Sequence, residues 1–113
     1  MSDSHHDQKR AFYRLRYPEA ARPGVRIDGR DGAVAELSEG GARIVLAGDG
    51  VGPGQRLVGV VRFTDGGTAR IAGEVQRLDG DEVVLILSVG VSLKRMLAEQ
   101  QRLLRDYPSH FDR

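Results

Sequence analysis

The chain has 113 residues and a mass of 12.4 kDa, which suits one compact domain and is too short for two full domains. It contains no cysteine, so disulfides, thiolate metal sites and a cysteine nucleophile are excluded. The three histidines, His5, His6 and His110, all lie near a terminus, which disfavours a histidine-based catalytic or metal centre. No apolar run approaches the ~20 residues of a membrane-spanning helix, and no signal-peptide core is present. We therefore expect a cytoplasmic protein without enzymatic activity, metal or membrane insertion.

The net charge of +1 is unevenly distributed along the chain. Residues 1–30 sum to +3, residues 31–91 to −4 and residues 92–113 to +2. A protein that binds a long nucleic acid needs a continuous basic face, whereas a basic arm on an acidic body suits a small, doubly charged ligand. Nearly all the basic residues are arginine, whose planar donors match phosphate oxygens and guanine edges. The alternative is that these arginines form only a solvated tail.

Residues 1–9 are polar and aperiodic, which predicts a flexible N-terminal tail followed by a basic arm over residues 9–24. From residue 25 onward, short apolar stretches alternate with Gly, Asp and Pro, a pattern typical of an all-β domain. The expected strands cover residues 32–37, 42–47, 55–64, 68–78 and 82–89. Asp-Gly pairs predict hairpin turns at residues 65–67 and 79–80. In the strand over 68–78 we expect side chains to alternate, and the apolar run over 82–89 predicts a strand that is buried on both faces.

The last part of the chain predicts one amphipathic helix over residues 92–107, capped by Ser92 and ended before Pro108. Its expected apolar face consists of Leu93, Met96, Leu97, Gln100, Leu103, Leu104 and Tyr107, with Glu99 and Arg102 on other faces. Short strands in close succession favour a closed barrel, because closure leaves no edge strand with unpaired backbone groups. We expect the helix to cover an open end of this barrel, and partner docking is the alternative.

Single motifs carry little chemistry in this chain. The glycine-rich segment over residues 48–54 lacks the Gly-Lys-Ser/Thr ending of a phosphate-binding loop and is interpreted as a connection. Ser38 has no histidine in a plausible triad context. Glu36 and Glu39 are interpreted as surface groups rather than as a catalytic carboxylate pair.

Two elements gain meaning in combination. The arm contains Arg10-Ala11-Phe12-Tyr13-Arg14, and a predicted strand ends about 25 residues later in Glu36-Leu37-Ser38-Glu39-Gly40-Gly41. This combination resembles the PilZ domain, a bacterial receptor module for the second messenger cyclic di-GMP, whose pattern is Arg-x-x-x-Arg in the arm and Asp/Asn-x-Ser-x-x-Gly on the barrel. The resemblance implies a single PilZ domain over residues 10–113, with its barrel over 25–90. It implies a mainly β fold: a six-stranded antiparallel barrel with a C-terminal amphipathic helix.

The resemblance also implies a cyclic di-GMP site. Its residues would be Lys9, Arg10, Arg14, Glu36, Ser38 and Gly41, with Arg16, Arg43 and Arg77 as secondary candidates. Guanidinium groups can bond to guanine edges and phosphates and can stack on a purine. Glu36 departs from the family pattern, because it is one methylene longer than the usual Asp or Asn. No cofactor other than the dinucleotide ligand is implied.

The expected function is a nucleotide-binding receptor that orders its arm around cyclic di-GMP and signals to a protein partner. One alternative is a degenerate PilZ-like adaptor that no longer binds the dinucleotide, with Glu36 as the telling change. Another is a small barrel that binds single-stranded nucleic acid. The acidic central segment and the few aromatic residues disfavour that second alternative.

Overall fold

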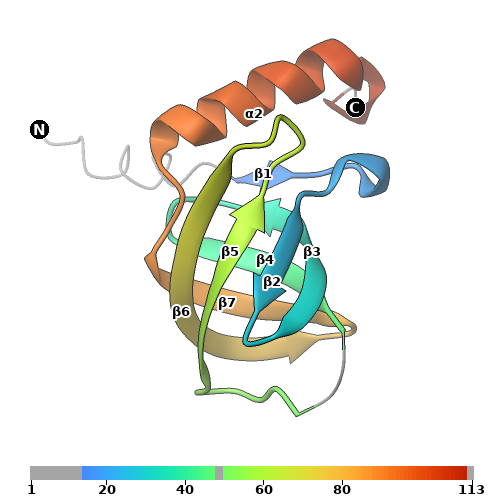
Figure 1. The fold of residues 1–113 in the computed structure, drawn as a ribbon. Coiled ribbons are helices and arrows are strands. Elements are labelled where there is room, and N and C mark those ends of the chain that lie inside the picture. The colour runs from blue at the N-terminus through green and yellow to red at the C-terminus, as the bar shows by residue number, and fades with distance from the viewer. Residues whose placement is uncertain (1–13, 48–49, 112–113) are drawn as a thin grey trace, which may run out of the picture.

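The computed structural model describes residues 14–47 and 50–111, so the predicted tail over 1–9 and the arm residues Lys9 and Arg10 lie outside it. Strands are the main secondary structure of the described chain (Figure 1). In chain order the elements are β1 (Leu15–Arg16), η1 (Glu19–Ala21), β2 (Gly24–Ile27), β3 (Arg30–Leu37), β4 (Gly41–Leu46), β5 (Arg56–Arg62), β6 (Thr68–Asp79), β7 (Glu82–Val89), α2 (Leu93–Asp106) and η2 (Pro108–Phe111).

Strands β2 to β7 form a closed antiparallel barrel. Going round it, the order is β2, β3, β4, β7, β6, β5 and back to β2, and every neighbouring pair is antiparallel. The short strand β1 pairs with the end of β3, with Leu15 opposite Leu37. The six-stranded barrel predicted from the sequence is confirmed. The sequence did not predict β1, because two residues have no periodicity and this strand depends on its tertiary partner.

The tight turns follow the predicted signals. Gly66 has a φ of +92° and Gly80 a φ of +64°, in the region that favours glycine. Beside the first of these turns, the Asp65 carboxylate accepts a hydrogen bond of 2.8 Å from the Gly67 amide. The described part of the glycine-rich segment, residues 50–54, connects β4 to β5, as interpreted from the sequence.

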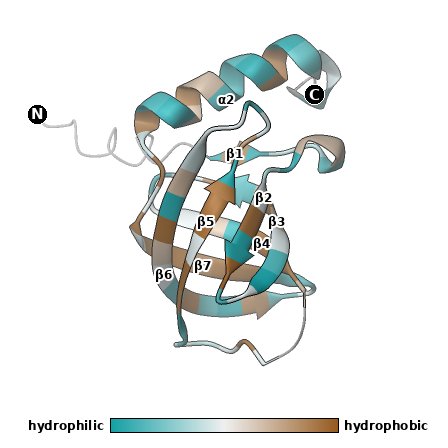
Figure 2. Ribbon diagram, viewed as in Figure 1, coloured by the Kyte–Doolittle hydropathy of each residue, from teal (hydrophilic) through white to brown (hydrophobic). Residues whose placement is uncertain are grey.

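Alternating side chains fill the barrel interior, as the hydropathy colours along the strands show (Figure 2). The regular alternation expected in β6 is wrong at two places, where the register with β7 shifts. At the first shift Ile71 and Ala72 are both buried, and a Cβ at Gly73 would collide with the Ile86 carbonyl oxygen. Bulges insert an extra residue and bend the strand, so they close the barrel at the expense of strict alternation.

Burial of β7 on both faces was predicted correctly for its first half, where Val83, Val84 and Leu85 are all buried, and wrongly for the rest. Ile86 is 53% exposed and Val89 is 46% exposed, while Leu85 and Leu87 point into the core. A single-layered barrel has one interior, so alternate residues of each strand face outward. Apolar Ile86 therefore lies on the outer surface, where it contributes to the site described below.

Helix α2 lies across one end of the barrel (Figure 1), which confirms the expected capping role. The Ser92 hydroxyl accepts a hydrogen bond of 3.1 Å from the Arg95 amide and caps the helix as predicted. The buried face of the helix is rotated from the predicted one, because Met96, Glu99 and Leu103 are its buried residues. Exposed fractions of the remaining leucines are 46% for Leu93, 46% for Leu97 and 45% for Leu104. The rotation brings Glu99 onto a buried partner, Tyr17, which directly follows β1. In residues 14–47 and 50–111, no helix is long and apolar enough to cross a membrane.

Candidate functional site

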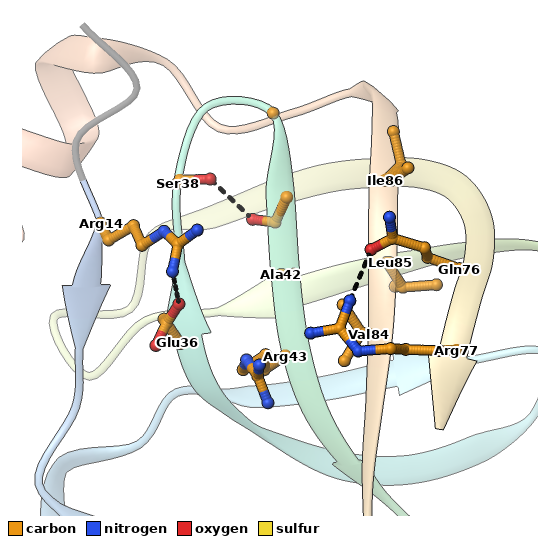
Figure 3. Close-up of a pocket in the computed structure, with 12 residues that line it drawn as sticks. Arg14, Glu36, Ser38, Ala42, Arg43, Gln76, Arg77, Val84, Leu85 and Ile86 are labelled. Atoms are coloured by element: carbon orange, nitrogen blue, oxygen red, sulfur yellow. Dashed lines mark hydrogen bonds and ion pairs between the residues drawn. The ribbon is translucent and has the colours of Figure 1, made fainter. Parts of the chain in front are cut away.

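A groove of about 500 Å³ is open on the outer face of the barrel, beside the turn that joins β3 to β4. Figure 3 shows Arg14 and Glu36 on one side of it and Gln76 and Arg77 on the other, with β4 and β7 between them. Its lining residues are Arg14, Glu36, Ser38, Gly40, Gly41, Ala42, Arg43, Gln76, Arg77, Val84, Leu85 and Ile86.

Strand register aligns the polar residues of this face. Directly paired residues in neighbouring antiparallel strands place their side chains on the same face of the sheet. Following the pairs across β1, β3, β4, β7 and β6 gives one row: Arg16, Glu36, Arg43, Val84 and Arg77. The three secondary candidates from the sequence therefore lie in a single row, although more than 60 residues separate the first from the last.

Glu36 lies between two arginines at one end of the row. Its carboxylate oxygens are 3.7 Å from Arg14 Nη1 and 3.6 Å from Arg16 Nη1. Both distances exceed a direct hydrogen bond, and the Arg14 side chain is 75% exposed. Exposed ion pairs of this kind contribute about 0–1 kcal/mol. An incoming anion can therefore replace Glu36 as the partner of these guanidinium groups at little cost.

Arg43 is held more firmly at the centre of the row. Its Nη1 lies 2.8 Å from an Asp79 oxygen and 3.3 Å from a Glu82 oxygen, and these hydrogen bonds raise the pKa of Arg43. The bond from Arg43 lowers the pKa of Asp79. Burial opposes ionisation of Glu82, but hydrogen bonds from Arg16 and Arg43 outweigh it and lower the pKa of Glu82. These carboxylates fix the position of Arg43, which lines the groove.

Arg77 differs from the other arginines of the row. Its Nη1 donates a hydrogen bond of 3.0 Å to the side-chain oxygen of its neighbour Gln76. Among the described residues it forms no ion pair with a carboxylate. The second register shift of β6, between Val75 and Arg77, lies at this position, and both Gln76 and Arg77 line the groove. Arg77 is thus an exposed cation with donors available to a ligand.

The turn between β3 and β4 lines the groove with Ser38, Gly40 and Gly41. The Ser38 amide donates to the Gly41 carbonyl at 2.9 Å, and the Ser38 hydroxyl approaches the same oxygen at 3.4 Å. A Cβ at Gly41 would lie 3.3 Å from the Leu85 carbonyl oxygen and 3.5 Å from Ser38 Oγ. The missing side chain keeps the groove open, and the long hydroxyl contact leaves Ser38 able to turn toward a ligand.

The structure brings most of the predicted site residues together. Arg14, Glu36, Ser38, Gly41, Arg43 and Arg77 line the groove, and Arg16 borders it through Glu36 and Glu82. Lys9 and Arg10 lie outside the described residues. Sequence reasoning missed Gln76 and Ile86. Gln76 lines the groove because of a bulge, which sequence periodicity does not reveal. The signal for Ile86 was an apolar residue at an outward position of β7.

The described residues contain no group of three or more His, Cys, Asp or Glu side chains that could hold a metal ion. The groove is lined by guanidinium groups, the Glu36 carboxylate, a hydroxyl, an amide and an apolar patch. Such a set can bind an anion that carries a flat, hydrogen-bonding ring.

The family comparison agrees with this geometry. The PilZ domain family model matches residues 8–108 of the chain. The chain belongs to the PilZ domain family. A search of curated proteins returned no match. The PilZ match covers the arm from residue 8, the β3–β4 turn and helix α2, so Arg14, Glu36, Ser38 and Gly41 fall within it.

Proposed function

We propose that this PilZ protein is a cytoplasmic, non-catalytic receptor for cyclic di-GMP, which binds in the groove beside the β3–β4 turn. The observation that carries the proposal is the row of Arg16, Arg43 and Arg77 across the groove face, with Arg14 beside it. Membership of a family of cyclic di-GMP-binding type supports the choice of ligand.

The chemistry of the groove fits the two parts of this ligand. Phosphate oxygens and the O6 and N7 atoms of guanine both accept the paired donors of an arginine. A guanidinium can also stack on a purine face, and Arg77 is exposed and bonded only to Gln76 among the interactions of the described residues. Val84 and Ile86 supply apolar surface against which a ring can pack. The groove volume of about 500 Å³ lies within the usual range of small-molecule sites, about 300–1,000 Å³.

Binding would proceed by exchange of partners. Phosphates replace Glu36 at Arg14 and Arg16, whose ion pairs with that carboxylate are long and exposed. The proposal assigns Lys9 and Arg10 to the same ligand and predicts that the arm becomes ordered around it. An arm rearranged in this way presents a new surface to a protein partner.

One observation favours a second function. Glu36 stands at the Asp/Asn position of the family pattern and places a negative charge within 4 Å of two arginines. A dianionic ligand must overcome that charge. In the alternative, the carboxylate permanently occupies Arg14 and Arg16, and the protein is an adaptor that does not bind cyclic di-GMP.

Calorimetric titration with cyclic di-GMP separates the two functions, with GTP as the control ligand. We expect saturable binding to the wild type and a loss of at least about tenfold in affinity for Arg77→Ala, because charge-assisted bonds are the strong ones. Arg70→Ala is the matched control, since Arg70 is an exposed arginine of the same strand that does not line the groove. Absence of both heat and thermal stabilisation at ~100 μM ligand would establish the adaptor instead.

A further inference from the structure

Two consecutive residues of the arm face opposite parts of the molecule. Arg16 points outward, and its guanidinium contacts Glu82 and also Glu36, which lines the groove. Tyr17 points inward and is 2% exposed beneath helix α2. Side chains alternate between the two faces of an extended segment, so any shift of this short segment moves the groove arginine and the buried tyrosine together.

Tyr17 ends in a buried polar cluster. Its hydroxyl donates a hydrogen bond of 2.7 Å to Glu99 Oε1, and Arg102 Nη2 donates to the same oxygen at 3.1 Å. Arg95 Nη1 lies 3.8 Å from the other oxygen of Glu99. Burial, followed by the bond to Glu99, raises the pKa of Tyr17, which keeps the phenol protonated as a donor. Glu99 is 1% exposed and is the buried charged residue of the described core.

A second contact links η2, the short helix after α2, to the arm at Arg16. His110 Nε2 in η2 lies 2.6 Å from the carbonyl oxygen of Arg16 and donates to it. On the opposite side, the Tyr17 amide donates to the Ala35 carbonyl of β3 at 2.9 Å. The backbone at residues 16–17 is thus bonded to the barrel on one side and to the C-terminal segment on the other.

These contacts differ in kind from apolar packing. An apolar helix face can shift by a few tenths of an ångström against its neighbours at little free-energy cost. A buried carboxylate, in contrast, must keep its hydrogen-bond donors in place. The cluster therefore fixes the position of Tyr17 relative to α2. Because Arg16 directly precedes Tyr17, the same cluster fixes where the Arg16 guanidinium meets Glu36 at the border of the groove.

We propose that helix α2 and the following η2 position β1, and with it Arg16, beside the groove, with Tyr17, Glu99 and His110 as positioning residues that do not touch the ligand. The consequence for affinity rests on the proposed function, whereas the positioning itself does not. Coupling between two sites is reciprocal. Ligand held by Arg16 is therefore also coupled to helix α2, 80 residues further along the chain.

Hydrogen exchange of the Tyr17 amide in the ligand-free protein tests the positioning. Tyr17→Phe keeps the ring and removes the bond to Glu99, and Glu99→Gln keeps the shape and removes the charge. We expect both variants to speed exchange of this amide by at least about tenfold, the value of one hydrogen bond to a charged group, while amides of β5 and β6 stay protected.

Asp31→Asn is the matched control, because it breaks an exposed ion pair that lies outside the cluster, the 2.6 Å pair of Asp31 with Arg26. It should leave exchange at Tyr17 unchanged. Unchanged exchange in Tyr17→Phe and Glu99→Gln would overturn the positioning, and so would equal acceleration in Asp31→Asn, which would indicate general loosening of the fold.

Titration of the same proteins with cyclic di-GMP then tests the consequence. We expect Tyr17→Phe to bind severalfold more weakly than the wild type and Asp31→Asn to bind equally well. Faster exchange with unchanged affinity would overturn the coupling to the ligand. A wild type that does not bind would overturn the proposed function, while the exchange result would still decide the positioning.

Discussion

Two regions of this PilZ domain contain ion pairs between arginine and glutamate, exposed to solvent in one region and buried in the other. In the groove, Arg14 and Arg16 meet Glu36 at the surface, where the arginine side chains are 75% and 47% exposed. Under helix α2, Arg102 meets Glu99, whose side chain is 2% exposed. The pairing chemistry is shared, and solvent access decides what each pair can do.

The difference follows from the energetics of charge burial. An exposed pair contributes about 0–1 kcal/mol and exchanges partners readily. A buried pair that loses one member leaves an uncompensated charge and costs about 3–5 kcal/mol. The groove therefore holds arginines close to their binding positions without committing them, whereas the helix cluster maintains one fixed arrangement.

The largest expected effect lies in the buried cluster. Glu99→Ala removes the partner of Arg102 and the acceptor of Tyr17. We expect the free energy of unfolding, measured by urea denaturation, to fall by about 3–5 kcal/mol. Glu36→Ala removes an exposed partner of two arginines and should change stability by no more than about 1 kcal/mol. Equal losses in the two variants would abolish the distinction between the regions.

The second effect concerns ligand affinity in the groove. Glu36→Gln removes the charge that competes with phosphate for Arg14 and Arg16 while keeping the side-chain length. We expect cyclic di-GMP to bind about threefold to tenfold more tightly, the value of one screened charge interaction of about 1 kcal/mol. Calorimetry measures the change. Weaker binding would mean that the Glu36 carboxylate itself holds the ligand.

The smallest effect is a dependence of stability on pH. Arg43 lowers the pKa of Asp79, whose ordinary value is 3.8, and Arg16 and Arg43 together lower the pKa of Glu82 from 4.5 against the effect of its burial. A carboxylate whose pKa is lowered by folding stabilises the protein above its ordinary value, and the stabilisation disappears as the pH falls through the folded-state value.

The matched variant for this effect is Asp79→Asn combined with Glu82→Gln. The wild type should unfold at a higher temperature than this variant at about pH 6. The difference should shrink steadily once the pH drops below about 4.5. A difference that grows on acidification would contradict the sign of both pKa shifts.

Much of the barrel could be predicted because local signals and the fold agree. Asp-Gly turns and β-branched runs mark β5, β6 and β7 directly in the sequence. The two register shifts between β6 and β7 could not be predicted, since no local pattern marks where one extra residue is inserted. Glu99 was assigned to a polar face of the helix, because periodicity identifies apolar stripes and cannot detect a buried carboxylate whose donor, Tyr17, lies 82 residues away.

The residues of the candidate site were predicted in part, whereas their alignment across the strands was not. The resemblance identified Arg14, Ser38 and Gly41, which line one groove in the structure. The alignment of Arg43 with Arg77 depends on strand register, which no local pattern specifies. Gln76 came into view only with the bulge that precedes Arg77.

The most direct test of the central claim follows the arginine side chains themselves. In ¹⁵N-labelled protein titrated with cyclic di-GMP, the Nε–H resonances of Arg14, Arg16, Arg43 and Arg77 should move and saturate together, since these groups gain the ligand as a partner. The Arg70 resonance should stay in place as the control. Stationary groove resonances at saturating ligand, or movement confined to arginines outside the groove, would contradict the account.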